Sequence, residues 1–171
     1  CYLKKAIASS LGAIMVLGVM WLPGKGYGVS HSENIKSLRV VMKRTKCYGT
    51  CPEYSVTVTG YGAVEYNGIQ FVSKKGRQTA NISSDQVVRL AEDLDRINFF
   101  ALEDKAFLWC YDTPRVSVSV SVDGRTKAVS NDGYCTGRAS GHQAEFIRVT
   151  QELDQLVDSG KWVDCIGRCR R

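Results

Sequence analysis

The clearest pattern along the chain is the alternation of apolar and polar residues that is typical of half-buried β-strands. Residues 54–59 read YSVTVT, and residues 116–122 read VSVSVSV. Each of these segments would place valines on one face of a sheet and hydroxyl side chains on the other. Further strands are expected at 35–44, 63–66, 69–73 and 126–130.

Short turn signals separate these strands. Asn67-Gly68 and Asp123-Gly124 are dipeptides that tolerate positive φ, so each predicts a tight hairpin turn. A turn at 67–68 would divide strand 63–66 from strand 69–73, which would then end at the turn residues 74–76. Residues 131–141 are polar and contain glycines, as expected for a loop.

Two segments show helical periodicity. Ser83 and Gln86 have the spacing of a capping box, and apolar residues then recur on one face through Val87, Leu90 and Leu94. A second helix is expected over 142–158, with Gly160 ending it. Its inward face would carry Phe146, Val149, Leu153 and Leu156.

The order of these elements predicts an α+β fold. Strands joined by hairpins form an antiparallel sheet of about five to six strands, and the two helices pack on one face of it. A doubly wound parallel sheet is excluded, because strands and helices do not alternate. The chain also lacks G-x-G-x-x-G and Walker motifs, which argues against a nucleotide-binding site of either kind.

The N-terminal segment resembles a secretory signal. Lys4 and Lys5 precede an uncharged run over 6–22, which Pro23 ends. Gly26 and Gly28 have the spacing that export cleavage after Gly28 requires. We therefore expect a signal peptide over 1–28, with a retained membrane anchor formed by residues 6–22 as the alternative. A linker over 29–34, a single domain over 35–162 and a basic, cysteine-containing tail over 163–171 would follow.

Charge does not suggest nucleic-acid binding. The 171-residue chain has a formal charge of +6, but three of its basic residues precede position 29 and all 17 acidic residues follow position 30. Much of the remaining excess is in the tail, at Lys161, Arg168, Arg170 and Arg171. The folded body is therefore nearly neutral. The tail could contact phosphates or an anionic envelope surface, or simply solubilise the chain end.

One sequence motif is specific enough to indicate a family. Residues 47–54 read CYGTCPEY, and residues 62–68 read GAVEYNG. Together these segments resemble a bacterial family known only as a domain of unknown function, with similarity extending from about Leu38 to Trp162. The resemblance implies an exported or envelope-associated protein and provides no catalytic residues.

The chain contains seven cysteines. Six remain if Cys1 leaves with the signal, and in an oxidising compartment an even number suggests up to three disulfides. Three pairs are expected, the first and third from their close spacing and the second because its cysteines flank the predicted hairpin. Exchange between the second and third pairs is the main rival. The pairs are Cys47–Cys51, Cys110–Cys135 and Cys165–Cys169.

Cys47 and Cys51 could also have a chemical function, either in copper binding or in thiol redox exchange. A C-x-x-x-C-P sequence resembles that of copper-delivery proteins, and thiolates suit Cu(I). The same pair could act in thiol redox exchange, although a strand follows it where thioredoxin-like sites have a helix. Such copper proteins use a downstream histidine, and this chain has only His31 and His142. A four-cysteine zinc site with Cys165 and Cys169 has unusual spacing.

These observations favour a non-catalytic module without a cofactor. The expected role is an exported, periplasmic or extracellular, disulfide-stabilised domain that binds a protein or a cell-envelope component. The alternative is a periplasmic thiol-redox or copper-handling protein that uses Cys47 and Cys51. Tyr48, Tyr54, Tyr61 and Tyr66 surround the first hairpin, where they would pack across strands or form a stacking platform for a ligand.

Overall fold

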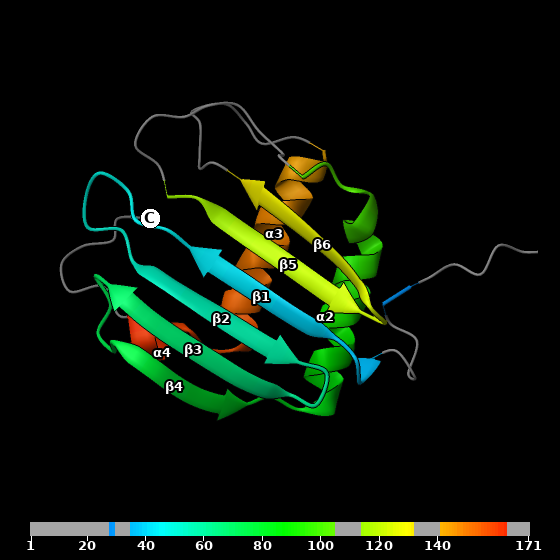
Figure 1. Ribbon diagram of the computed structural model, residues 1–171, viewed down its shortest axis with the longest axis horizontal. Helices are drawn as coiled ribbons and strands as arrows, with labels where there is room; N and C mark the ends of the chain where they lie inside the picture. The colour runs from blue at the N-terminus through cyan, green and yellow to red at the C-terminus, as the bar shows by residue number, and fades with distance from the viewer. Residues whose placement is uncertain (1–27, 30–34, 105–113, 132–140, 164–171) are drawn as a thin grey trace, which may run out of the picture.

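The computed structural model describes residues 28–29, 35–104, 114–131 and 141–163. Six strands form one antiparallel sheet in the order β4-β3-β2-β1-β5-β6 (Figure 1). The strands are β1 (Arg39–Arg44), β2 (Glu53–Thr59), β3 (Ala63–Gln70), β4 (Gly76–Asn81), β5 (Val116–Val122) and β6 (Arg125–Asn131).

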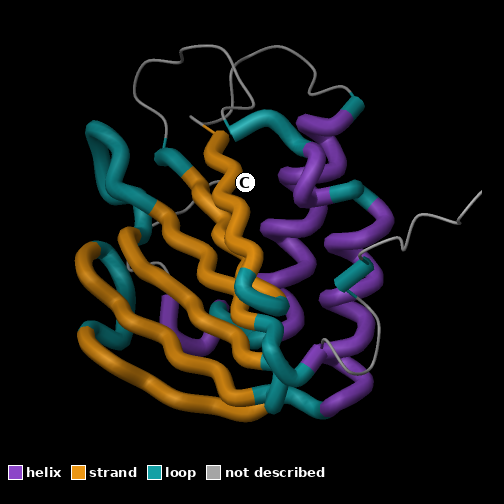
Figure 2. The backbone as a smooth tube through the Cα atoms, turned by 45° about the vertical axis from the view of Figure 1, so that its right-hand side comes forward, coloured by secondary structure: helices purple, strands orange, loops and turns teal. Residues whose placement is uncertain are grey.

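Helices α2 (Ser84–Arg96) and α3 (His142–Leu156) cover one face of the sheet, which gives the molecule two layers (Figure 2). The short helices η1 (Phe99–Ala101) and α4 (Gly160–Val163) complete the described elements. The predicted α+β class, the antiparallel sheet and its two main helices are therefore confirmed. None of the helices in the described ranges is long and apolar enough to cross a membrane.

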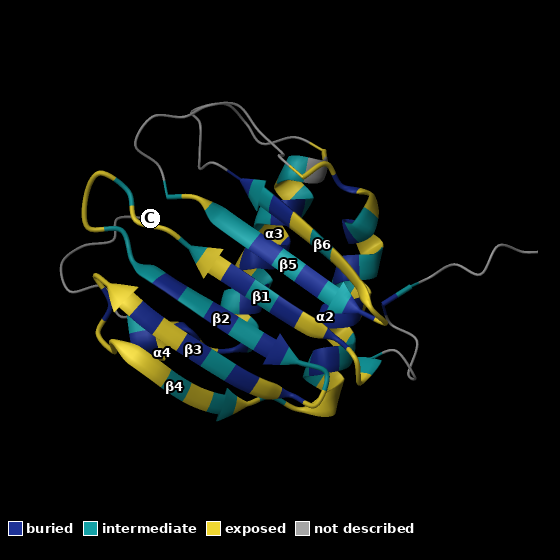
Figure 3. Ribbon diagram, viewed as in Figure 1, coloured by how far each residue is buried: buried dark blue, intermediate teal, exposed yellow. Residues whose placement is uncertain are grey.

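The core lies between the sheet and the helices, as the alternation predicts. Inward positions of the strands are buried and outward positions are more exposed, which gives the striped pattern of Figure 3. Val40, Val58 and Val120 align across β1, β2 and β5, and each is fully buried. The opposite face of these strands carries hydroxyl and charged side chains, and neither helix covers it (Figure 1).

The predicted start of α2 is confirmed in detail. The Ser83 hydroxyl accepts a hydrogen bond from the Gln86 amide, and the Gln86 side chain accepts one from the Ser83 amide. This capping box satisfies two amides that the helix itself cannot pair.

Three predicted element boundaries are wrong. Asn67-Gly68 is not a turn, because β3 continues to Gln70 and the chain turns over 71–75 before β4. The first strand begins at Arg39 rather than at residue 35, because residues 35–38 form a turn closed by a hydrogen bond from the Leu38 amide to the Ile35 carbonyl. Helix α3 ends at Leu156, and Asp158 rather than Gly160 takes the left-handed conformation after it.

Candidate functional site

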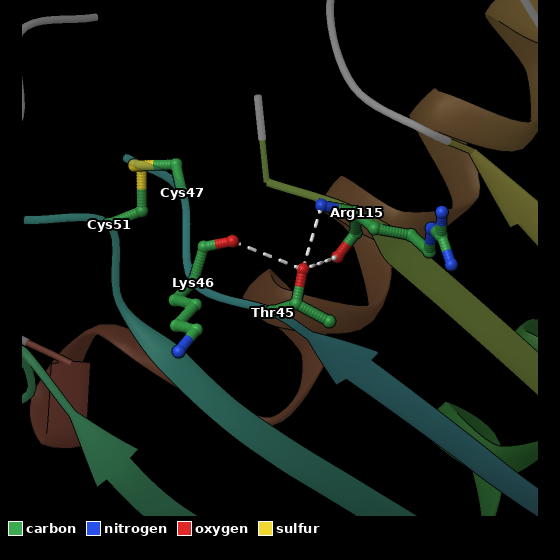
Figure 4. Close-up of a disulfide and its surroundings, with 5 residues drawn as sticks. All are labelled: Thr45, Lys46, Cys47, Cys51 and Arg115. Atoms are coloured by element: carbon green, nitrogen blue, oxygen red, sulfur yellow. Dashed lines mark hydrogen bonds between the residues drawn. A yellow bond between two sulfur atoms is a disulfide. The ribbon is translucent and has the colours of Figure 1, made fainter. Parts of the chain in front are cut away.

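Cys47 and Cys51 form a disulfide in the loop between β1 and β2 (Figure 4). The base of this loop is joined to the start of β5, because the Thr45 amide donates to the Arg115 carbonyl at 2.9 Å. In return, the Arg115 amide donates to Thr45 Oγ1 at 3.0 Å. The disulfide and these hydrogen bonds fix a loop whose apex residue, Tyr48, is 93% exposed.

The other cysteine pairings stay predictions. Cys1, Cys110, Cys135, Cys165 and Cys169 lie outside the described residues, so the structure tests neither their pairing nor a zinc site that includes them. Within the described ranges, no three histidine, cysteine or acidic side chains are grouped as metal ligands.

The loop between β3 and β4 lies at the same end of the sheet as the disulfide loop (Figures 1 and 2). The two loops are linked through neighbouring strands, because Glu53 at the start of β2 pairs with Gln70 at the end of β3. Ile69 and Phe71 are 46% and 45% exposed. We call residues 45–53 and 69–75 together the cystine end.

Phe71 has φ of 53°, a left-handed conformation that a bulky side chain rarely takes and that costs about 1 kcal/mol or more. The loop around it is well anchored. Val72 is buried, and the Ser73 hydroxyl and the Lys74 amide both donate to the Trp162 carbonyl, at 2.8 and 3.0 Å. The fold therefore keeps the Phe71 ring partly exposed although its backbone conformation is strained.

The cystine end is basic as well as apolar. It carries Lys46, Lys74 and Lys75 against a single acidic residue, Glu53. All three lysines are exposed, whereas Glu53 is half-buried. Of the four large apolar side chains that are exposed in the described ranges, three lie here, and the fourth, Tyr61, lies at the opposite end of the sheet.

The tyrosines do not form a stacking platform. Tyr54 and Tyr66 are buried on the helix side of the sheet, with ring centroids 5.5 Å apart. Trp162 of α4 stacks on Tyr66 with centroids 4.9 Å apart. Cross-strand packing thus explains Tyr54 and Tyr66, while Tyr48 and Tyr61 lie exposed at opposite ends of the sheet.

Gly68 is required by close packing rather than by a turn. A Cβ atom there would lie 2.1 Å from the Lys74 carbonyl oxygen and 2.9 Å from the Tyr66 hydroxyl. The final glycine of the GAVEYNG segment therefore lets the 71–75 loop fold back over β3. It connects the buried tyrosine to the geometry of the cystine end.

A polar cluster around Asp154, which includes the Tyr54 hydroxyl, was not predicted from the sequence. Asp154 of α3 accepts hydrogen bonds from Arg44 at 2.5 and 3.0 Å, from the Tyr54 hydroxyl at 2.8 Å and from the Ser159 hydroxyl at 2.8 Å. One signal was present, because Arg44 continues the inward series of Leu38, Val40 and Met42. A charged residue in that phase implies a buried partner.

Electrostatics in this cluster favour a neutral tyrosine and a charged arginine. Burial, together with the Asp154 charge, raises the pKa of Tyr54, and this outweighs the lowering effect of Arg44. Burial lowers the pKa of Arg44, but its interactions with Tyr54 and Asp154 outweigh this and raise it overall. Burial, and to a lesser extent the Asp154 charge, raises the pKa of Tyr66 to about 12. Arg44, Tyr54 and Asp154 thus form a hydrogen-bonded structural network, beside which the Tyr66 hydroxyl is buried without a hydrogen-bond partner among the described residues.

A shallow groove of about 360 Å³ lies on the uncovered face of the sheet. Arg77 and Glu65 form an ion pair of 2.6 Å in it, and Arg39, Thr57 and Asn81 also line it. Its lining is mostly polar, and one ion pair occupies part of it.

A comparison with known protein families identifies the family of this domain. Residues 38–157 match the family described as Domain of unknown function (DUF6438). The chain belongs to this family. The matched range begins just before β1 and ends just after α3, so the DUF6438 domain comprises the whole sheet and both main helices. No curated protein matches the chain.

Proposed function

We propose that this DUF6438 protein is an exported, disulfide-stabilised binding module without catalytic activity. Its target is a cell-envelope component, and its binding surface is the cystine end. The observation that carries the proposal is the set of exposed apolar and basic side chains on the disulfide loop, the end of β3 and the loop after it. They are Tyr48, Ile69, Phe71, Lys46, Lys74 and Lys75.

The chemistry of this surface fits an anionic lipid bilayer. Aromatic rings are favoured at the boundary between headgroups and acyl chains, and nearby lysines are attracted to acidic headgroups. Exposed apolar side chains that lie together, rather than singly, are typical of interaction sites. An acidic protein would match the lysines as well, and binding to soluble polyglutamate tests that alternative.

Preorganisation supports the same proposal. The disulfide closes one loop, and hydrogen bonds to the Trp162 carbonyl hold the other. Loops already held in place lose less conformational entropy on binding. The strain at Phe71 also has an explanation if the exposed ring has a role, because residues held in rare conformations cluster at functional sites.

Co-sedimentation with lipid vesicles tests the proposal. The exported protein should bind vesicles of phosphatidylcholine and phosphatidylglycerol more tightly than vesicles of phosphatidylcholine alone. Reversal of two charges by Lys74→Glu and Lys75→Glu should weaken binding to the acidic vesicles roughly tenfold or more. Lys36→Glu with Arg89→Glu is the matched control, because both side chains are exposed and lie outside the cystine end.

Absence of binding to either kind of vesicle would exclude the lipid surface as the target, and equal affinity for both would exclude attraction between the lysines and acidic headgroups. Binding to soluble polyglutamate, without binding to acidic vesicles, would instead indicate an acidic protein partner.

A further inference from the structure

Gly28 and Val29 precede the first strand but pack against helix α2 of the folded domain. The Val29 backbone amide donates to Asp95 Oδ1 at 2.6 Å, a contact between residues 66 positions apart. The Val29 side chain is only 1% exposed and belongs to the core. In Figures 1 and 2 this short segment lies beside helix α2.

Gly28 packs against the same carboxylate. A Cβ atom at position 28 would lie 3.1 Å from Asp95 Oδ2, so both carboxylate oxygens face this two-residue segment. In the uncleaved chain Gly28 thus lies against the carboxylate that the Val29 amide contacts. Glycine is also one of the small residues that export proteases need immediately before the cleaved bond.

Asp95 lies at a position where a neighbouring positive charge would be stabilising. It is the second-last residue of α2, and the carbonyl dipoles at a helix C-terminus disfavour a negative charge. The Val29 backbone amide is a neutral donor to this carboxylate. An α-ammonium group at the same nitrogen would offer a full charge and charge-assisted hydrogen bonds, which are shorter and stronger.

We propose that the Gly28–Val29 peptide bond is the export cleavage site and that the new N-terminus of Val29 forms an ion pair with Asp95. A signal peptidase would hydrolyse the bond with one water molecule. Gly28 would leave with the leader as a carboxylate, and Val29 would become the first residue with a protonated amine. Processing thus produces the group that ties the N-terminus to α2.

The first test is the N-terminus of the exported protein. The full chain is produced with its own leader in a bacterial export host, and the recovered protein is analysed by intact mass and N-terminal sequencing. The proposal predicts Val29 as the first residue. A retained leader, or a first residue other than Val29, would overturn it.

The second test measures the reactivity of the α-amine. The recovered native protein is treated with an acylating reagent, and the Val29 amine and the lysines are followed by peptide mass mapping. The Val29 amine should react roughly tenfold or more slowly in the native protein than after denaturation, because a buried, paired amine is withheld from the reagent. Equal rates in the two states would overturn the proposal, whether or not any variant folds.

Asp95→Asn should remove most of this protection, whereas Asp93→Asn should retain it. Asp93 lies in the same helical turn, where it pairs with Arg96. Equal protection of Val29 in Asp95→Asn and in the unaltered protein would show that the carboxylate does not hold the amine.

Discussion

Tyr54 donates a hydrogen bond of 2.8 Å to Asp154, a residue 100 positions later in the chain. Through this contact β2, which follows the disulfide loop directly, is joined to α3. The same carboxylate accepts hydrogen bonds from Arg44 and Ser159, so one acidic side chain links two strands, a helix and the turn before α4.

Asp154→Asn should destabilise the protein by roughly 3 kcal/mol, because a largely buried guanidinium would lose its charged partner. The measurement is the free energy of unfolding in guanidinium chloride. Asp158→Asn is the matched control, since Asp158 is exposed and its ion pair with Lys161 is loose, at 3.8 Å. The control should change stability by less than about 0.5 kcal/mol. Equal effects of the two substitutions would refute the structural role of the cluster.

Stability should fall at alkaline pH. The folded protein raises the pKa of Tyr66 to about 12, whereas an unfolded tyrosine titrates near 10. Between these values the unfolded chain binds fewer protons than the folded one, so rising pH favours unfolding. The contribution of Tyr66 is complete below pH 10 and is lost as pH approaches 12. The slope reaches at most about 1.4 kcal/mol per pH unit for each such tyrosine.

Tyr66→Phe should flatten this alkaline loss, because the ring stack on Trp162 remains and the titrating group is removed. Tyr61→Phe, at an exposed position, serves as the control. Chemical unfolding curves measured at several pH values provide the comparison. An unchanged slope in Tyr66→Phe would show that its hydroxyl does not couple to folding.

Gly68→Ala should cost roughly 3 kcal/mol or prevent folding, because the new methyl group would overlap the Lys74 carbonyl. Gly76→Ala offers a contrast within the same loop region. Gly76 has a positive φ of 75°, but a Cβ atom there meets nothing within 4 Å. Its substitution should cost only about 1–2 kcal/mol of backbone strain. Thermal unfolding of the two variants measures the difference, and equal losses would contradict the close-packing explanation.

Replacement of Cys47 and Cys51 by serine should lower stability by at most about 2 kcal/mol, because the disulfide closes a short loop. Binding to acidic vesicles should weaken more noticeably, since Tyr48 would lose its fixed position. The rival redox or copper role makes a different prediction, in which the replacement leaves vesicle binding intact. Vesicle binding of the serine variant therefore separates the two.

The sequence predicted those features that depend on neighbouring residues. Alternating valines placed β2 and β5 correctly, and the Ser83–Gln86 spacing placed the start of α2. Strand β4 was missed because Gly76–Asn81 is a polar edge strand with no alternating apolar residues. Gly68 was wrongly predicted to form a turn. A glycine is needed there because the Lys74 carbonyl of the following loop packs against it, and the local sequence does not show this contact.

The candidate site depended more on contacts between distant residues. The disulfide loop could be recognised from Cys47 and Cys51, but its proximity to Phe71 follows from the register of β2 and β3. Likewise, the pairing of Arg44 with Asp154 joins residues 110 positions apart, and no local pattern specifies such a partner. The inward phase of Arg44 indicated only that a partner was needed.

The most direct test of the account compares the vesicle binding of two variants that lose exposed aromatic rings. Tyr48→Ser with Phe71→Asn removes the exposed rings of the cystine end, and asparagine tolerates the positive φ at position 71. Tyr61→Ser removes a ring that is 78% exposed at the opposite end. If the cystine end docks on lipid, the first variant should lose acidic-vesicle binding by roughly tenfold or more, and Tyr61→Ser should bind like the unaltered protein. Equal binding by both variants would contradict the assignment of this surface.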